Sequence, residues 1–203
     1  MRQIVDLRKQ KPELKVLLSI GGWGSGRFSE MAANDEYRRA FAADCDRVVK
    51  EFALDGIDID WEYPTSSMAN ISSSPDDTEN FTLLMQDIRA AIGNEKELTL
   101  ATVASARYID FKAILPSVDF VNIMAYDMAS APKHHSALYP SGHSGDITSD
   151  GAVTAHLKAG VPPSKLVMGM PFYGRGGDGY PSFQDYNKAV SYTHLRAHET
   201  GAY

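Results

Sequence analysis

Three acidic residues at alternate positions of one short segment are the part of this sequence best suited to chemistry. Asp58, Asp60 and Glu62 alternate with apolar residues in DGIDIDWEYP, residues 55–64. Alternate side chains of a β-strand point to the same face, so the three carboxyl groups would share one face. In a buried parallel strand, like charges this close cannot all ionise, and some of the pKa values rise. Such crowding costs stability, which is typical of a site that handles protons rather than of a structural strand.

Two other interpretations of the acids remain. In an antiparallel, half-exposed strand the acidic face would simply be solvated, although the helices predicted on either side of this strand argue against that arrangement. The three carboxylates could also bind Mg²⁺ or Mn²⁺, since these hard ions prefer oxygen ligands. The aromatic and glycine-rich segments nearby do not favour a metal site. We therefore expect neither a metal ion nor another cofactor.

Polar and aromatic residues also follow other predicted strands. The first strand ends in SIGGW at 19–23, the fourth in MAYD at 124–127 and the fifth in MPFYGR at 170–175. A doubly wound sheet gathers its ligands at one switch point. A (β/α)8 barrel instead brings the ends of many strands to one mouth. The distribution over four strands favours the barrel.

Strands and helices alternate along the chain. Periodic apolar residues predict one helix with a stripe from Tyr37 to Phe52 and a second with a stripe from Phe81 to Ile92, capped by Ser74 with Pro75 at its first position. We also predict helices in a polar stretch at 2–11 and in a segment at 150–159. This alternation is typical of parallel βαβ units. The predicted strands are 14–20, 54–61, 98–104, 119–126 and 165–170.

The composition excludes several classes of protein. The chain has 203 residues, 43% of them hydrophobic, which is ordinary for a globular protein. Its net charge of −6 argues against nucleic acid as a partner, and no apolar run reaches the roughly 18 residues that would span a membrane. The single cysteine, Cys45, cannot form an internal disulfide.

The segments SIGGW, DGIDIDWEYP, MAYD and GMPFYGR, in this order, resemble the signature strands of family-18 glycoside hydrolases, the chitinases. The resemblance covers about residues 2–175 and corresponds to barrel strands three to seven. It implies an α/β fold, a partial TIM (β/α)8 barrel in which strands 1, 2 and 8 are missing. It also implies hydrolysis of β-1,4 linkages between N-acetylglucosamine units of chitin, with retention at the anomeric carbon.

The resemblance assigns catalytic roles to five residues. Glu62 resembles the general acid, and the substrate's own acetamido oxygen is the nucleophile, an exception to the two-carboxylate scheme. Asp60 would hold the acetamido N–H and share a proton with Asp58. Tyr126 would donate a hydrogen bond to the acetamido carbonyl, and Asp127 would contact the same sugar.

Other residues receive binding or structural roles. Ser19 fits a donor to Asp58. Five residues match positions that line the sugar groove: Trp23, Tyr63, Met124, Tyr173 and Arg175. We expect Trp61 and Phe172 to pack in the interior, His134 and His135 to be solvated, and His156 to lie on a helix surface.

Alternatives within the family stay open. The same residues serve an endo-β-N-acetylglucosaminidase acting on glycans or peptidoglycan, and some relatives are non-catalytic chitin-binding proteins. The expected partners are chitin or N-acetylglucosamine oligosaccharides, and we expect the protein to be a monomer. A secreted location is inferred only from the polymeric substrate, because no signal peptide is recognised in the sequence.

The sequence also suggests how the chain is organised. We expect one partial catalytic domain at 1–190 and a non-native tail at 191–203, with a natural disordered tail as the alternative. Five parallel strands cannot close a barrel. We therefore expect the polypeptide by itself to be poorly stable and nearly inactive.

Overall fold

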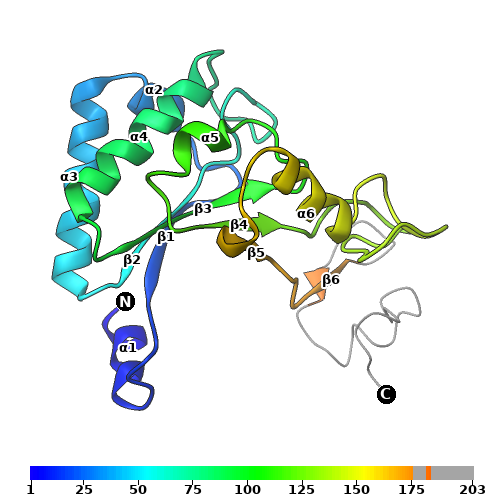
Figure 1. The fold of residues 1–203 in the computed structure, drawn as a ribbon, viewed down its shortest axis with the longest axis horizontal. Coiled ribbons are helices and arrows are strands. Elements are labelled where there is room, and N and C mark those ends of the chain that lie inside the picture. Colours follow the sequence, from blue (N-terminus) through cyan, green and yellow to red (C-terminus); the bar gives the residue numbers. More distant parts are fainter. Residues whose placement is uncertain (176–181, 184–203) are drawn as a thin grey trace. The chain divides into compact units, whose positions relative to one another are not determined.

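A computed structural model describes residues 1–175 and 182–183 of the chain, so the predicted tail at 191–203 lies outside the described residues. Five strands form one sheet in the order of the sequence, and the pairs β1–β2 and β2–β3 are parallel (Figure 1). This order confirms the predicted alternation of strands and helices. The strands are β1 Leu17–Gly21, β2 Gly56–Asp60, β3 Glu97–Val103, β4 Phe120–Met124 and β5 Leu166–Met168.

Helices connect the strands, and none of those in the described residues is both long and apolar enough to cross a membrane. A short antiparallel pair, β6 (Gly174–Arg175) with β7 (Ser182–Phe183), follows the sheet. The helices are α1 Arg2–Val5, α2 Phe28–Ala32, α3 Asp35–Phe52, α4 Asp77–Ile92, α5 Phe111–Ile114 and α6 Ser149–Lys158, with 3₁₀ turns η1 Asp6–Lys9 and η2 Pro163–Lys165.

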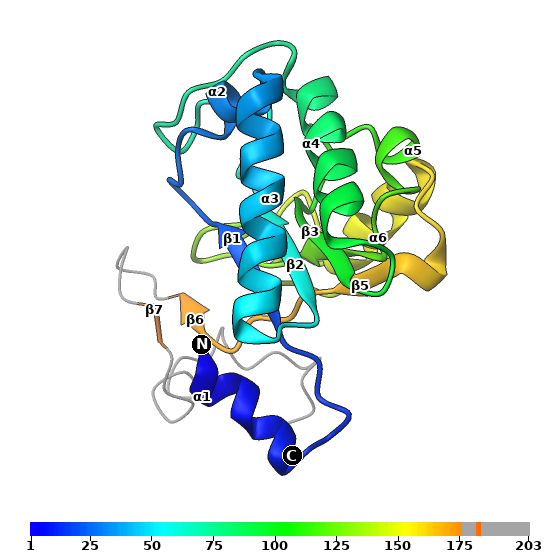
Figure 2. The same ribbon diagram turned by 90° about the vertical axis from the view of Figure 1, so that its left-hand side faces the viewer.

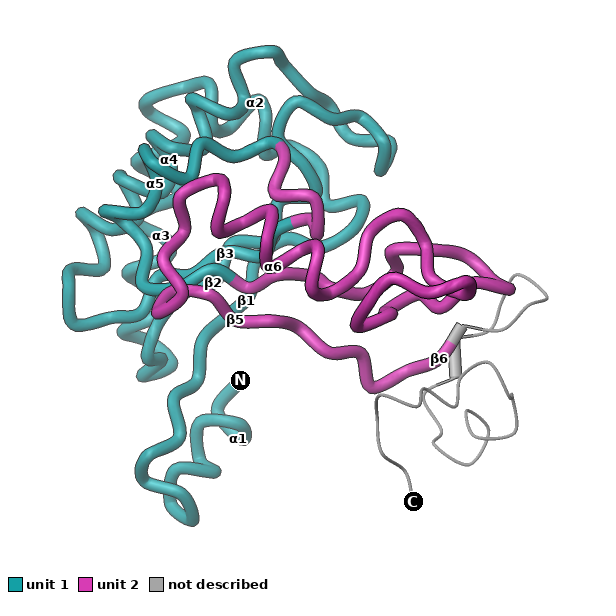
Figure 3. The backbone as a smooth tube through the Cα atoms, turned by 45° about the vertical axis from the view of Figure 1, so that its right-hand side comes forward, with its two compact units in different colours: residues 1–102, 108–121 teal, residues 103–107, 122–203 magenta. Residues whose placement is uncertain are grey.

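The chain divides into two compact units, coloured separately in Figure 3. Unit 1 comprises residues 1–102 and 108–121, and it holds β1, β2 and β3 up to residue 102, together with helices α1 to α5. Unit 2 comprises residues 103–107 and 122–203, and it holds α6 and β5.

In unit 1, α3 and α4 lie side by side, and α3 packs against β2 (Figure 2). Asn34 caps α3, since its side-chain oxygen accepts hydrogen bonds from the backbone N–H groups of Glu36 and Tyr37. The buried face of α3 carries Arg38, Ala42, Cys45 and Val49. Tyr37 is 56% exposed, so the predicted apolar stripe was wrong at its first position.

Helix α4 begins later than the sequence predicts. Asp76 is its N-cap residue, and Ser74 and Pro75 belong to the preceding turn. The reason is that the Ser74 backbone N–H donates to the side chain of Asp77, which closes the turn before the helix starts. The predicted apolar stripe is correct, because all of its members are buried: Phe81, Leu84, Met85, Ile88 and Ile92.

Strand β2 is apolar on one face and acidic on the other. Ile57 and Ile59 are fully buried, whereas Asp58 and Asp60 on the opposite face are half-buried. Burying an isoleucine contributes about 1.5–3 kcal/mol, so the apolar face anchors the strand that carries the acids. Trp61 continues the apolar face beyond the end of β2 and is also buried.

Unit 2 has an apolar core around Ala104, Ile123 and Ala152. The Thr148 hydroxyl caps α6 by accepting a hydrogen bond from the Gly151 N–H. His156 in the same helix is fully buried, and its Nδ1 lies 2.8 Å from the Ala152 carbonyl oxygen. The prediction of a helix-surface histidine was therefore wrong. Burial lowers the pKa of His156, and the hydrogen bond to Ala152 partly offsets that shift.

Candidate active site

Asp58 lies in the middle of a row of polar side chains that crosses three strands. The strand register pairs Ser19 of β1 with Asp58, and Asp58 with Thr99 of β3. The Ser19 hydroxyl donates to Oδ2 of Asp58 over 2.7 Å, and the Thr99 hydroxyl donates to Oδ1 over 2.6 Å. Ser19 thus makes the contact expected from the sequence. Thr99 was missed, although its place in the parallel register could have indicated it.

Asp60 lies two residues further along the same face of β2. Its Oδ1 atom is buried and has no hydrogen-bond partner among the residues that the structure describes. Burial, followed by the charges of Glu62 and Asp58, raises the pKa of Asp60 to about 7. The carboxyl group can therefore gain or lose a proton near neutral pH. We call Asp58, Asp60 and Glu62 the acid row.

Gly21 allows β1 to lie close to the end of the acid row. It pairs with Asp60, and a Cβ atom at Gly21 would lie 2.0 Å from the backbone oxygen of Asp60. Its φ of +128° is also a conformation that other residues rarely adopt. The following residue, Gly22, donates its N–H to the same oxygen over 2.8 Å. Only glycine fits at position 21.

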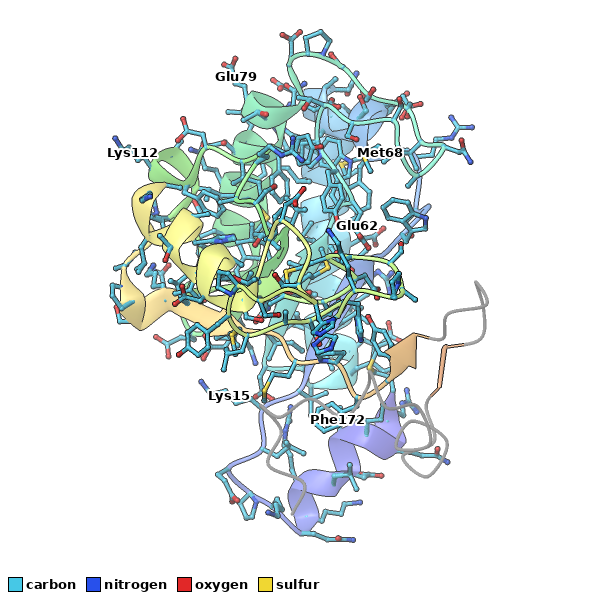
Figure 4. The ribbon with its side chains drawn as sticks, turned by 90° about the vertical axis from the view of Figure 1, so that its right-hand side faces the viewer. Lys15, Glu62, Met68, Glu79, Lys112 and Phe172 are labelled. Atoms are coloured by element: carbon cyan, nitrogen blue, oxygen red, sulfur yellow. The ribbon has the colours of Figure 1, made fainter. Side chains whose placement is uncertain are left out.

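Glu62 comes from the segment that directly follows β2 (Figure 4). The preceding residue, Trp61, stacks on Phe28 with ring centroids 5.4 Å apart. Trp61 also meets the edge of Phe81 at 5.7 Å. The interior position expected for Trp61 is confirmed, and this packing fixes the backbone immediately before Glu62.

Aromatic rings gather beside the acid row within unit 1. Trp23 is 61% exposed and meets Tyr63 edge to face, with centroids 6.4 Å apart. Tyr63 stacks almost parallel on Tyr108 at 5.4 Å, and the sequence interpretation did not include Tyr108. Burial, and then the charge of Glu62, raises the pKa of Tyr63, so its phenol stays protonated. Flat rings with polar edges suit the C–H faces and hydroxyls of a carbohydrate.

A second group, in unit 2, surrounds Asp127. The Tyr173 hydroxyl donates to Oδ2 of Asp127 over 2.7 Å, and the Tyr126 and Tyr173 rings meet edge to face at 6.1 Å. The backbone N–H of Asp127 donates to Nδ1 of His135 over 3.2 Å. The His135 ring stacks on Tyr173 with centroids 5.3 Å apart. We call Tyr126, Asp127, His135 and Tyr173 the tyrosine cluster.

His135 is buried, so the prediction that it is solvated was wrong. The polar loop after β4 folds back on itself, and the Met128 N–H donates to the His135 carbonyl oxygen over 2.9 Å. His134 is half-buried, and its ring stacks on that of His143. Nothing in the local spacing of the histidines indicated either contact, because both depend on how a long loop closes.

The remaining predicted residues of unit 2 have varied surroundings. Met124 ends β4 and is half-buried. Phe172 is 92% exposed (Figure 4), so the prediction that it packs in the interior was wrong, because the segment after β5 leaves its ring in solvent. The backbone of Arg175 pairs in β6, but its side chain lies outside the described residues.

Gly169 makes room for the tyrosine cluster. A Cβ atom there would lie 2.7 Å from the Ile123 backbone oxygen and 3.0 Å from the ring of Tyr126. The Gly169 N–H also donates to the same Ile123 oxygen over 2.8 Å. A larger residue at 169 would displace either the strand or the phenol.

No three His, Cys, Asp or Glu side chains converge on a metal-binding arrangement within 1–175 and 182–183. In the acid row, Asp58 faces hydroxyl donors, while Asp60 has a carboxyl group that titrates near neutrality. Such a pair of environments is suited to holding and transferring protons.

Comparison with known proteins identifies the family. The model of the glycosyl hydrolases family 18 matches residues 1–199. The chain belongs to glycosyl hydrolase family 18. The family-18 chain is 38% identical to chitinase A1 of Niallia circulans, over 88% of its own length and 29% of that protein.

Solved family-18 structures confirm the fold class, an α/β chain that forms part of a TIM barrel. The chitinase domain of the spore coat protein CotE from Clostridium difficile has a TM-score of 0.83 at 41% identity, over 87% of this chain and 55% of that one. A family-18 N-acetylglucosaminidase from Paenibacillus barengoltzii has a TM-score of 0.80 at 39% identity, over 85% and 55%. The chain thus spans about half the length of these structures and less of the curated relative.

Proposed function

We propose that this family-18 chain carries the acids of a chitinase active site. These acids would transfer protons while the enzyme cleaves β-1,4 linkages between N-acetylglucosamine units. The observation that carries this proposal is the acid row. Asp60 has its pKa raised to about 7 by burial and by the charges of Glu62 and Asp58. A carboxyl group that titrates near neutrality beside a second carboxyl group is what acid catalysis of glycoside cleavage requires.

In the proposed reaction, Glu62 protonates the glycosidic oxygen as the bond to the leaving sugar breaks. The acetamido oxygen of the substrate attacks the anomeric carbon, which gives an oxazolinium ion and, after attack by water, a product with retained configuration. Asp60 holds the acetamido N–H and stabilises the positive charge. Asp58 exchanges a proton with Asp60, and the Ser19 and Thr99 hydroxyls fix its orientation.

The tyrosine cluster is proposed to orient the acetamido group. Tyr126 donates a hydrogen bond to its carbonyl oxygen, and Asp127 contacts the same sugar. The Tyr173 hydroxyl and the Nδ1 atom of His135 hold Asp127 by its side chain and its backbone. Trp23, Tyr63, Met124 and Arg175 are proposed to line the groove. Orientation of a neighbouring nucleophile contributes much of the rate in reactions of this kind.

One comparison favours a second substrate class. The Paenibacillus barengoltzii structure, at 39% identity, is that of an N-acetylglucosaminidase. The same acids would then act on glycans or peptidoglycan that contain N-acetylglucosamine. Both substrate classes occur outside the cell or at its surface, so we also propose that the enzyme is secreted.

The test uses a chimera in which residues 1–175 replace the matching part of the Clostridium difficile chitinase domain. We expect the chimera to hydrolyse a chitooligosaccharide, and Glu62→Gln to lower turnover by about 10²–10⁴-fold while binding is kept. The matched control is Glu79→Gln, an exposed glutamate of α4, which should not change turnover. A folded but inactive chimera, or a Glu62→Gln variant that keeps full activity, would contradict the proposal. Glycan and peptidoglycan substrates in the same assay decide between the two classes.

A further inference from the structure

Asp77, the first residue of α4, is a fully buried acid that the proposed reaction does not use. Its Oδ1 atom accepts a hydrogen bond from the Ser29 hydroxyl over 2.7 Å. Its Oδ2 atom accepts from the backbone N–H of Ser74 over 2.8 Å and from that of Thr65 over 3.1 Å. Buried acids are rare, and this one has a partner on each oxygen.

The donors to Asp77 belong to segments that are far apart in the sequence. Ser29 lies in α2, Ser74 lies in the turn before α4, and Thr65 lies three residues after Glu62. Thr65 has a φ of +62°, in a turn closed by the Ser66 N–H donating to the Tyr63 carbonyl oxygen. Asp77 therefore ties the turn that follows Glu62 to α2 and α4.

The other end of this segment is held by the same two helices. Trp61, immediately before Glu62, packs between Phe28 of α2 and Phe81 of α4. Phe28 is the neighbour of Ser29, and Phe81 lies four residues, about one helical turn, after Asp77. An apolar contact and a polar contact from one pair of helices thus hold the backbone on both sides of Glu62.

We propose that Asp77 is a positioning residue for Glu62, which it acts on through the Thr65 N–H. The role of Glu62 itself rests on the proposed function. A displacement of a catalytic group by 1 Å can cost about 10²-fold in rate, so a buried acid that fixes the turn after Glu62 matters to the chemistry without touching the substrate. The polar contact is needed because the aromatic packing holds only the residue before Glu62.

The test is made on the 203-residue chain without substrate. Asp77→Ala removes the acceptor of the Thr65 and Ser74 N–H groups. Asp77→Asn is the rescue variant, because its oxygen can accept from both N–H groups while its amide donates to the Ser29 hydroxyl. The readout is the titration of Asp60, followed by ¹³C NMR of its carboxyl carbon, since Glu62 contributes to the raised pKa of that group.

We expect the Asp60 midpoint to fall by about one pH unit in Asp77→Ala and to stay near the wild-type value in Asp77→Asn. The control is Ile88→Ala, a fully buried position of the same helix, which should lower the melting temperature and leave the midpoint unchanged. An unchanged midpoint in Asp77→Ala, or an equal shift in Ile88→Ala, would overturn the proposal.

A second measurement needs no variant, and it tests the hydrogen bonds of Asp77 directly if Asp77→Ala does not fold. In the wild-type chain the amide hydrogens of Thr65 and Ser74 should exchange at least about 100-fold more slowly than in an unstructured peptide. Exchange at the unprotected rate would overturn the proposal. Because neither measurement involves hydrolysis, failure of the proposed function would leave these results unchanged, and failure of this proposal would leave the Glu62→Gln result unchanged.

Discussion

The acid row of unit 1 and the tyrosine cluster of unit 2 are assembled in different ways. In the acid row, the alternation of a single strand sets which side chains share a face, and the register with β1 and β3 supplies the partners of Asp58. In the tyrosine cluster, Asp127 follows a strand, but its partners His135 and Tyr173 come from 8 and 46 residues further along the chain. The two regions therefore depend on different parts of the fold.

This difference predicts how each region responds to substitution. Removing a carboxyl group from the acid row changes charge in a place where backbone hydrogen bonds hold the geometry, so the effect should fall on catalysis. Removing a partner from the tyrosine cluster releases a loop, so the effect should fall on stability as well. Four experiments test this distinction, and they are given in decreasing order of the effect that we predict.

Asp60→Asn should have the largest effect. An amide cannot supply the negative charge proposed for Asp60, so turnover of the chimera on a chitooligosaccharide should fall by about 10²–10³-fold, without a fall in melting temperature. Asp76→Asn, at an exposed position, is the control. A loss of turnover smaller than tenfold would mean that the acid row does not take part in catalysis.

Tyr126→Phe should have a smaller effect on the same reaction. The substitution removes only the phenol hydroxyl, and we expect kcat to fall by about 10–100-fold while KM changes little. Tyr139→Phe provides a matched control, since Tyr139 is exposed and also lies in unit 2. A change confined to KM would instead assign Tyr126 to uniform substrate binding.

His135→Ala should affect stability. The Asp127 N–H loses its acceptor, and Tyr173 loses its stacking partner. We expect the free energy of unfolding of the chain, measured in urea, to fall by about 2 kcal/mol. His143→Ala, at an exposed position, should cost less than about 0.5 kcal/mol. Equal effects of the two substitutions would show that the contacts of His135 do not stabilise the tyrosine cluster.

The pH dependence of stability should show the smallest effect. The pKa of Asp60 rises from 3.8 to about 7 on folding, so the folded chain binds more protons than the unfolded chain between these values. Stability is therefore lost as the pH rises through this window. At pH 8 we expect Asp60→Asn to melt about 4 °C above the wild type, and this difference should shrink below pH 5. A constant difference would show that Asp60 ionises normally in the folded chain.

The same contrast explains what the sequence predicted. Period-2 alternation placed Asp58 and Asp60 on one face and Trp61 in the interior, because strand geometry is local. The stripe of α4 was correct for the same reason. Tyr37 was misplaced because an apolar stripe in the sequence indicates the buried face of a helix only to within about one residue. The centre of the buried face of α3 depends on how the helix packs against its neighbours.

Contacts that depend on loops were not predicted. His135 was assigned to solvent and Phe172 to the interior, and the structure reverses both, because burial in these segments depends on how the chain folds back. Nothing in the local sequence pattern singled out Asp77. Its contact with Thr65 joins two segments whose proximity no local pattern reveals.

Proton delivery by Glu62 is the central step of the proposed reaction, and a change of leaving group tests it directly. In the chimera, Glu62→Gln should be compared on a chitooligosaccharide, whose leaving sugar must be protonated, and on a dinitrophenyl glycoside of N-acetylglucosamine oligomers, whose leaving group needs no proton. We predict a loss of about 10²–10⁴-fold on the first substrate and less than about tenfold on the second. Equal losses on both substrates would contradict the assignment of Glu62 as the general acid.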